Sequence, residues 1–270
     1  MEVKILSGWS NPGGSTTAFI DLTNLLNSNG IPCVFYGAHD WHLDKCSARN
    51  FLKYRPHKDD IVISHFIKIN PICKKHIYSC HEKEITPLKS MDLSMYHSIV
   101  FVSESQKDWH NINRTSVIIP PIVTKVEWRN PKNNIAGVIG SIDRNKQTHE
   151  SIKRALNDGY NKVILFGAIT DTPYFNESVI PFIDSGDAGW NDNKPASPYS
   201  EGLAGYEDDR EAMYGQVSEV YHSSLSETYG LVEAECRLSG IPFNGISNGQ
   251  EILDNKEILE RWKKLLKITR

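Results

Sequence analysis

The sequence predicts an α/β protein built from two Rossmann-like domains. In both halves of the chain, short apolar segments suited to buried strands alternate with segments whose apolar residues recur at helical spacing. Pro120 and Pro121 interrupt this alternation and open a segment that leads into the second half. We therefore expect domains at 1–125 and 126–270, with a terminal helix in the second.

The first half predicts a β-loop-α-β unit followed by further strands of the same sheet. We expect strands at 3–6, 32–36, 60–64, 76–79, 98–103 and 117–119, and helices at 16–26 and 104–110. The loop before the first helix contains Gly13 and Gly14. Because glycine has no side chain, this pair allows the backbone to approach a ligand closely, although a plain turn would also explain it.

Two histidines follow predicted strands of the first half. His65 comes directly after the strand at 60–64, and His81 follows the strand at 76–79. The carboxyl ends of parallel strands form the edge at which α/β proteins bind ligands. A single histidine is more often structural, so position alone does not select between the two.

The second half predicts the same alternation. We expect strands at 135–139, 163–166 and 217–223, helices at 210–214, 231–238 and 257–266, and a loop with an amphipathic helix over 141–156. Residues 170–200 are rich in Asp, Asn, Pro and Ser, and we expect an irregular segment there. The basic amphipathic helix at 257–266 can pack on the protein or bind a membrane surface.

The stretch at 226–242, SETYGLVEAECRLSGIP, carries the most specific pattern. Glu227 lies in a loop after a predicted strand, and Glu235 lies about two turns into the helix that follows. The first backbone N–H groups of a helix have no intrahelical acceptor and carry the positive end of its dipole, which suits phosphate. Two carboxylates near such a site suit a ligand with both phosphate and sugar hydroxyls. The alternative is that both glutamates are solvated side chains of an amphipathic helix.

This pattern resembles the signature of retaining GT-B glycosyltransferases of family 4. Ser-Glu-x-Tyr-Gly-Leu is followed by a second Glu and by Gly-x-Pro. The resemblance implies two Rossmann-like domains facing across a cleft. It also implies transfer of a sugar from a nucleoside diphosphate sugar, most commonly a UDP-sugar, to an acceptor hydroxyl with retention of anomeric configuration.

The resemblance assigns roles to residues of both domains. Glu227 would hold the hydroxyls of the donor sugar and Glu235 the ribose hydroxyls. Lys146 and the backbone N–H groups of Tyr229, Gly230, Leu231 and Val232 would bind the diphosphate. Gly13, Gly14 and His81 would contact the donor from the first domain, with His65 as the alternative histidine.

One position departs from the family pattern. Ser141 stands where the family usually has an arginine that neutralises the diphosphate. Arg144 lies in the same loop and could supply that charge, although an ordinary surface position explains it equally well. No Asp-x-Asp sequence occurs in the chain, so we expect no metal at the diphosphate and no other cofactor.

Composition limits the class of partner. The 270 residues are 39% hydrophobic and 23% charged, with a net charge of −3, so no strong global field attracts nucleic acid. Residues 1–130 hold 15 Lys/Arg and 12 Asp/Glu, whereas residues 131–270 hold 15 and 21. No apolar run approaches the ~18 residues of a membrane span. Five cysteines without a Cys-x-x-Cys motif favour reduced thiols and a cytoplasmic protein.

The acceptor is less defined. Residues 42–58 hold five Lys/Arg and one acid, with aromatic residues between them. This segment could bind an anionic acceptor such as a glycan, a lipid or DNA, or it could be a solvated helix. A glycan or lipid-linked glycan is our first expectation, and a hydroxymethylated DNA base is the alternative. A nucleotide-sugar epimerase, a sugar-phosphate phosphorylase and a non-catalytic nucleotide-sugar-binding module are rival functions.

Overall fold

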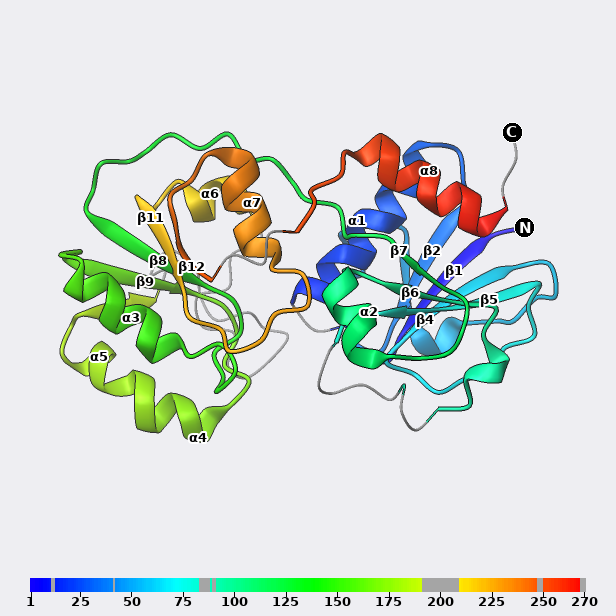
Figure 1. Ribbon diagram of the computed structural model, residues 1–270, viewed down its shortest axis with the longest axis horizontal. Coiled ribbons are helices and arrows are strands. Elements are labelled where there is room, and N and C mark those ends of the chain that lie inside the picture. The colour runs from blue at the N-terminus through cyan, green and yellow to red at the C-terminus, as the bar shows by residue number, and fades with distance from the viewer. Residues whose placement is uncertain are drawn as a thin grey trace. The chain divides into compact units, whose positions relative to one another are not determined.

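The computed structural model describes residues 1–10, 13–40, 42–82, 88, 91–190, 209–246 and 250–267. The chain divides into two compact units (Figure 1). Unit 1 comprises residues 1–122 and 250–270, and unit 2 comprises residues 123–249. The first segment of unit 1 ends at residue 122, three residues before the domain boundary that we expected at 125. Residues 250–270, which we assigned to the second domain, belong instead to unit 1.

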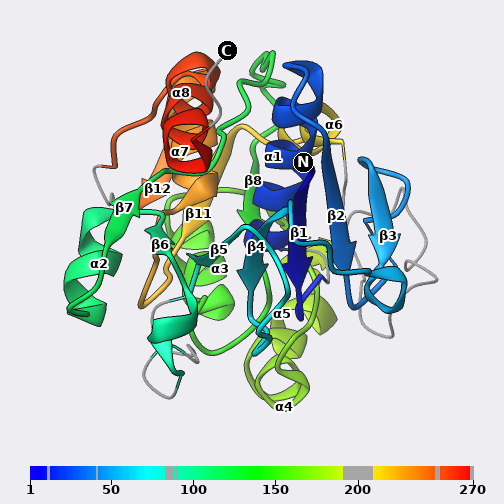
Figure 2. The same ribbon diagram turned by 90° about the vertical axis from the view of Figure 1, so that its right-hand side faces the viewer.

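The sheet of unit 1 is parallel, with strand order β3-β2-β1-β4-β5-β6-β7. Figure 2 shows this order from β7 on one side to β3 on the other. The strands are β1 Val3–Ser7, β2 Cys33–Gly37, β3 Ala48–Asn50, β4 Ile61–His65, β5 Lys75–Cys80, β6 Ser98–Phe101 and β7 Ser116–Ile118. The helices are α1 Gly14–Ser28, η1 Phe51–Lys53, η3 Leu93–Met95, α2 Glu104–His110 and α8 Asn255–Leu266. The central strands are buried on both faces, which explains why their residues do not alternate regularly between apolar and polar.

The terminal helix α8 packs within unit 1, beside α1 (Figures 1 and 2). Its apolar side chains Ile258, Leu259, Trp262 and Leu266 are buried. Its Arg261 donates to the carbonyl oxygen of Ile118 at 3.3 Å. Because the apolar face is buried in the protein, the alternative that this face binds a membrane surface is wrong.

The sheet of unit 2 is also parallel, with strand order β10-β9-β8-β11-β12. Its strands are β8 Ile135–Ile139, β9 Lys162–Phe166, β10 Ala188–Trp190, β11 Glu219–His222 and β12 Phe243–Gly245. Its helices are α3 Thr148–Asn157, α4 Thr172–Tyr174, η4 Phe175–Val179, α5 Ile180–Asp184, α6 Arg210–Tyr214 and α7 Leu231–Ser239. The two sheets, each flanked by helices, give the Rossmann-like organisation that the sequence predicts for both halves.

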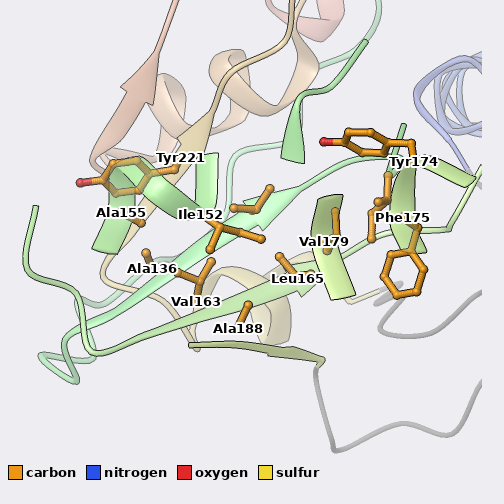
Figure 3. Packing of buried hydrophobic residues seen from close by; sticks show 12 residues of the cluster. Ala136, Ile152, Ala155, Val163, Leu165, Tyr174, Phe175, Val179, Ala188 and Tyr221 are labelled. Atoms are coloured by element: carbon orange, nitrogen blue, oxygen red, sulfur yellow. The ribbon is translucent and has the colours of Figure 1, made fainter. Parts of the chain in front are cut away.

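The core on one face of this second sheet holds α3 in place. Figure 3 shows Ile152 and Ala155 of α3 gathered with Val163 and Leu165 of β9 and with Val179 of η4. All five side chains are buried, and Ile152, Ala155, Val163 and Val179 have no exposed surface. This packing fixes the loop between β8 and α3, which contains Lys146.

Two expectations about irregular or helical segments are wrong. Residues 172–184 are helical and residues 188–190 form the edge strand β10, whereas we expected an irregular segment over 170–200. The remaining expected loop, 191–200, lies outside the described residues. The segment at 42–58 is not an α-helix but contains the short strand β3 and the 3₁₀ turn η1.

Candidate functional site

The candidate site of unit 2 lies where the strand order reverses. β8 pairs with β9 on one side and with β11 on the other, so the chain leaves these strands in opposite directions. Two loops, 140–147 after β8 and 223–230 after β11, emerge at the carboxyl edge of the sheet at this point. Open α/β sheets bind ligands in the crevice that such a reversal creates.

Asn145 joins the two loops. Its carbonyl oxygen accepts a hydrogen bond from the backbone N–H of Leu225 at 2.8 Å. Its side-chain amide donates to the carbonyl oxygen of Ser226 at 3.1 Å. The residues on either side of these contacts, Lys146 and Glu227, are thereby held close together.

Asp143 shapes the loop that carries Lys146. One carboxylate oxygen accepts from the backbone N–H of Lys146 at 2.9 Å, and the other accepts from the hydroxyl of Ser141 at 2.6 Å. The hydroxyl of Thr170 also donates to Asp143, at 3.1 Å. Ser141 therefore supports the loop through Asp143 and supplies no charge of its own.

Glu227 forms an ion pair with Lys146. The Nζ atom of Lys146 contacts Oε1 of Glu227, and Nε2 of His222 lies 3.3 Å from the same oxygen. The Glu227 side chain is 17% exposed. Burial alone would raise the pKa of this carboxyl, but the hydrogen bond from His222 and the charge of Lys146 outweigh it and lower that pKa to about 2. Glu227 is therefore ionised at neutral pH.

The N-terminus of α7 lies directly after Glu227, as the sequence predicts. Gly230 caps this helix in the left-handed region, with φ 78°, and no side chain caps it. The N–H groups of Leu231 and Val232 belong to the first helical turn, whose donors have no acceptor within the helix. Tyr229 is buried, so its side chain packs in the protein. The helix ends at Gly240, also as predicted, with φ 70°.

Glu235 lies on the same helix and is held by two side chains of α6. The hydroxyl of Tyr214 donates to Oε2 at 2.7 Å, and Nε of Arg210 lies 2.9 Å from Oε1. The Glu235 side chain is 6% exposed. Burial and the charge of Glu235 raise the pKa of Tyr214 well above its usual value, so the phenol remains a hydrogen-bond donor.

Sequence reasoning did not single out Arg210 and Tyr214. A usable signal was present, because the two residues are four positions apart on a predicted helix and therefore lie on one face. Arg210 also donates to the hydroxyl of Thr124 at 2.7 Å. The contact helps to join the start of unit 2 to the group of residues around Glu235.

Arg144 is not part of the Lys146–Glu227 pair. Its guanidinium lies 3.3 Å from a carboxylate oxygen of Asp171 and 3.6 Å from one of Glu177. The Arg144 side chain is 64% exposed. The structure thus brings Lys146 and Glu227 together and places the charge of Arg144 against the start of the segment that contains α4 and η4.

The predicted residues of unit 1 lie at the corresponding edge of the first sheet. Gly13 is the N-cap of α1 and Gly14 is its first residue, so the glycine pair forms a helix N-terminus. His65 ends β4 and His81 follows β5, and these strands are neighbours. The centroids of the two imidazole rings lie 5.4 Å apart.

The surroundings of the two histidines differ. His65 is fully buried, and its ring nitrogens contact the hydroxyl of Ser7 and a carboxylate oxygen of Glu82, both at 2.9 Å. His81 is half-buried, and its Nε2 contacts the hydroxyl of Ser79 at 3.1 Å. Burial and the nearby His65 lower the pKa of His81 to about 3. As a residue His81 is therefore less buried than His65, and its imidazole is neutral at neutral pH.

The basic segment at 42–58 presents cations at the surface. Arg49, Lys53, Arg55 and Lys58 are exposed. The aromatic rings of Phe51 and Tyr54 are half-buried against the core of unit 1, and Trp41 lies outside the described residues. An anionic acceptor at this surface remains a prediction.

In the part of the chain that the structure describes, no three His, Cys, Asp or Glu side chains are grouped so that they could hold a metal ion. None of the described helices has the length and apolar character that crossing a membrane requires.

Solved structures with the same fold are numerous. HepE from Anabaena, solved in complex with UDP-glucose, is similar with a TM-score of 0.62 and 12% identity, over 98% of this chain and 90% of that one. A variant of TarM from S. aureus, solved with fondaparinux, α-GlcNAc-glycerol and UDP, gives 0.66 and 10%, over 99% and 93%. WaaG, a glycosyltransferase involved in lipopolysaccharide biosynthesis, gives 0.58 and 10%, over 98% and 90%.

The fold is GT-B. No protein-family model and no curated protein matches the sequence. The GT-B structures thus share the arrangement of strands and helices with this chain at 10–12% identity. At that level of identity the similarity establishes the fold, and function must be argued from the residues of the site.

Proposed function

We propose that this protein is a metal-independent glycosyltransferase that moves a sugar from a UDP-sugar to an acceptor hydroxyl with retention of configuration. The observation that carries the proposal is the pairing of Lys146 with Glu227 beside the uncapped N-terminus of α7. This arrangement offers a cation and backbone donors to a diphosphate, and a carboxylate to the attached sugar.

The reaction breaks the bond between the anomeric carbon and a diphosphate oxygen. The acceptor oxygen bonds to that carbon, and its proton passes to the departing diphosphate. Negative charge grows on the diphosphate in the transition state, so preorganised positive groups lower the barrier. Lys146 and the backbone N–H groups of 229–232 supply these groups in our proposal.

The two carboxylates hold different parts of the donor in this proposal. Glu227 accepts hydrogen bonds from the donor sugar, and Glu235 accepts them from the ribose. Arg210 and Tyr214 already fix the Glu235 carboxylate, which supports a role in positioning one rigid part of the ligand. Arg144 is assigned only as a second cation at the rim of its loop, since its present partners are Asp171 and Glu177.

Gly13, Gly14 and His81 are assigned to the donor through the family resemblance. His81 is half-buried as a residue and its imidazole is neutral, which supports hydrogen bonding to a sugar hydroxyl. His65, with both ring nitrogens occupied, is the poorer candidate.

The solved complexes support the choice of donor and acceptor class. HepE was solved with UDP-glucose and TarM with UDP. WaaG acts in lipopolysaccharide biosynthesis, and TarM was solved with α-GlcNAc-glycerol and fondaparinux. We therefore propose a UDP-sugar donor and a glycan or lipid-linked glycan acceptor, and a cytoplasmic reaction.

A donor-turnover assay in EDTA tests the proposal. Release of UDP from a panel of UDP-sugars should be detectable for the wild type, with and without candidate acceptors, and Glu227→Gln should abolish it. Glu219→Gln is the matched control, because Glu219 begins the same strand β11 at the opposite edge of the sheet. Donor binding without turnover on any acceptor would favour the non-catalytic module, and epimerised sugar without an acceptor would favour the epimerase.

A further inference from the structure

Among the described residues, two side chains contact the carboxylate of Glu227, and both contact the same oxygen. Lys146 Nζ and His222 Nε2 contact Oε1, the latter at 3.3 Å. Within the described residues, Oε2 has no hydrogen-bond partner. The carboxylate is therefore anchored through one oxygen, and the other remains available to a ligand hydroxyl.

Donor binding places two demands on Lys146. In the unliganded protein its ammonium group neutralises Glu227, which is largely buried. In the proposed reaction the same group must bind the diphosphate. Withdrawing the cation from a buried carboxylate is unfavourable unless another positive group replaces it.

His222 is placed to be that replacement. It ends β11, it is 8% exposed, and its ring lies 6.1 Å from that of Phe243. The imidazole needs only a proton on Nε2 to donate to Glu227 now. Uptake of a second proton on Nδ1 would turn it into a cation beside Oε1.

Among the residues that the structure describes, the acidic side chain in contact with His222 is that of Glu227. The neighbouring strands β8 and β12 contain no titratable residue. From α3, Arg154 donates to the hydroxyl of Ser223 at 3.1 Å. From α7, Glu235 is held by α6, and Glu233 lies 3.9 Å from Arg237.

We propose that His222 is a positioning residue that takes up a proton when the donor diphosphate draws Lys146 away from Glu227. The protonated imidazole then keeps Glu227 ionised and keeps Oε2 directed at the donor sugar. This inference rests on the proposed function, because it needs the diphosphate to bind Lys146. Donor binding and protonation are thereby linked, so donor affinity rises as the pH falls.

Calorimetry of UDP-glucose binding in two buffers tests the linkage. At about pH 7, where histidine ordinarily changes charge, titrations in PIPES and in Tris, which differ in ionisation enthalpy and contain no phosphate, should give different enthalpies for the wild type, with the sign of net proton uptake. His222→Gln keeps a hydrogen-bond donor but cannot take the proton, so its enthalpy should not depend on the buffer. His149→Gln is the matched control, because His149 is the other histidine of residues 131–270 and contacts Tyr174 on the far side of α3.

The outcomes separate the two proposals. Equal enthalpies in both buffers for a wild type that clearly binds UDP-glucose would overturn the role of His222 and leave the glycosyltransferase proposal standing. No binding of UDP-glucose or UDP would overturn both. If His222→Gln does not fold, NMR of the imidazole Cε1–H signals of the wild type decides instead: saturating UDP-glucose should shift the His222 signal towards the protonated form, and an unmoved signal would contradict the proposal.

Discussion

The phenol of Tyr214 donates a 2.7 Å hydrogen bond to Oε2 of Glu235, and both residues are almost completely buried. Together with Arg210 on Oε1, this contact fixes the orientation of the carboxylate before any ligand binds. A buried carboxylate with fixed orientation is suited to hold one part of a ligand at one angle.

Tyr214→Phe removes this hydrogen bond without changing the shape of the side chain. Because the bond is to a charged group, we expect the free energy of unfolding to fall by about 2 kcal/mol, and the affinity for UDP to fall as well. Arg210→Met should cost about 3 kcal/mol, since it removes the guanidinium that contacts Oε1 of the buried Glu235 carboxylate. Urea unfolding and calorimetry measure both effects. Glu211→Gln, on the exposed face of α6, is the control and should change neither quantity.

The two glycines at the ends of α7 allow a matched pair of substitutions. Gly230 and Gly240 both have φ near +70°, so Ala at either position should cost about 1 kcal/mol of stability. Nothing lies within 4 Å of a methyl group at Gly240, so the cost there is conformational only. Gly230→Ala should also weaken UDP binding, whereas Gly240→Ala should not, because it lies about 14 Å along the helix. Equal affinities for the two variants would exclude the N-terminus of α7 from the diphosphate site.

The stability contributed by Glu227 should depend on pH. Its folded-state pKa is lowered from 4.5 to about 2, so the unfolded chain takes up the proton first as the pH falls. The ionised carboxylate therefore stabilises the fold fully above about pH 5, by about 3 kcal/mol, and this contribution disappears as the pH falls towards 2. The difference in unfolding free energy between the wild type and Glu227→Gln, measured from neutral to acidic pH, should shrink over that window. A constant difference would mean that the pair with Lys146 is not formed in solution.

Arg144 and Lys146 should differ in importance. Lys146→Gln removes the cation beside Glu227 and should abolish detectable UDP binding. Arg144→Gln removes an exposed group whose partners are Asp171 and Glu177, so it should change stability by less than about 1 kcal/mol and weaken UDP binding only a few-fold. Lys153→Gln, on the exposed side of α3, is the control. A larger loss of affinity from Arg144→Gln than from Lys146→Gln would reverse our assignment.

The long elements of the fold were predictable from the sequence. The buried strand β8 is a continuous apolar run, β1 and β4 are mostly apolar, and α7 is bounded by Gly230 and Gly240. The short edge strands β3, β10 and β12 were missed, because their residues ARN, AGW and FNG form no apolar run, unlike those of the equally short β7. The helices at 172–184 were missed because Asp171 and Pro173 were interpreted as loop residues. In the structure Asp171 caps α4 by accepting from the N–H of Tyr174, and Pro173 lies in the first turn, where its missing N–H has no consequence.

The candidate site could be read from the sequence only where its residues share one stretch of chain. Glu227, Gly230 and Glu235 share one stretch of chain, so the pattern showed them together. The contacts of Glu227 with His222 and of Glu235 with Arg210 depend on side-chain geometry that no spacing encodes. The contact of Arg144 with Glu177 could not be predicted from spacing either. Glu177 is 33 positions away, in a segment that we expected to be irregular.

Hydrogen–deuterium exchange of the wild type with saturating UDP in EDTA tests the central claim most directly. Our account predicts slower exchange in peptides covering 140–147 and 226–235, and unchanged exchange in peptides covering 175–185. Protection at both loops without metal would place the nucleotide at the point where the second sheet reverses its strand order. Binding of UDP that leaves both loops unprotected would contradict the assignment of Lys146, Glu227 and the N-terminus of α7 as the donor site.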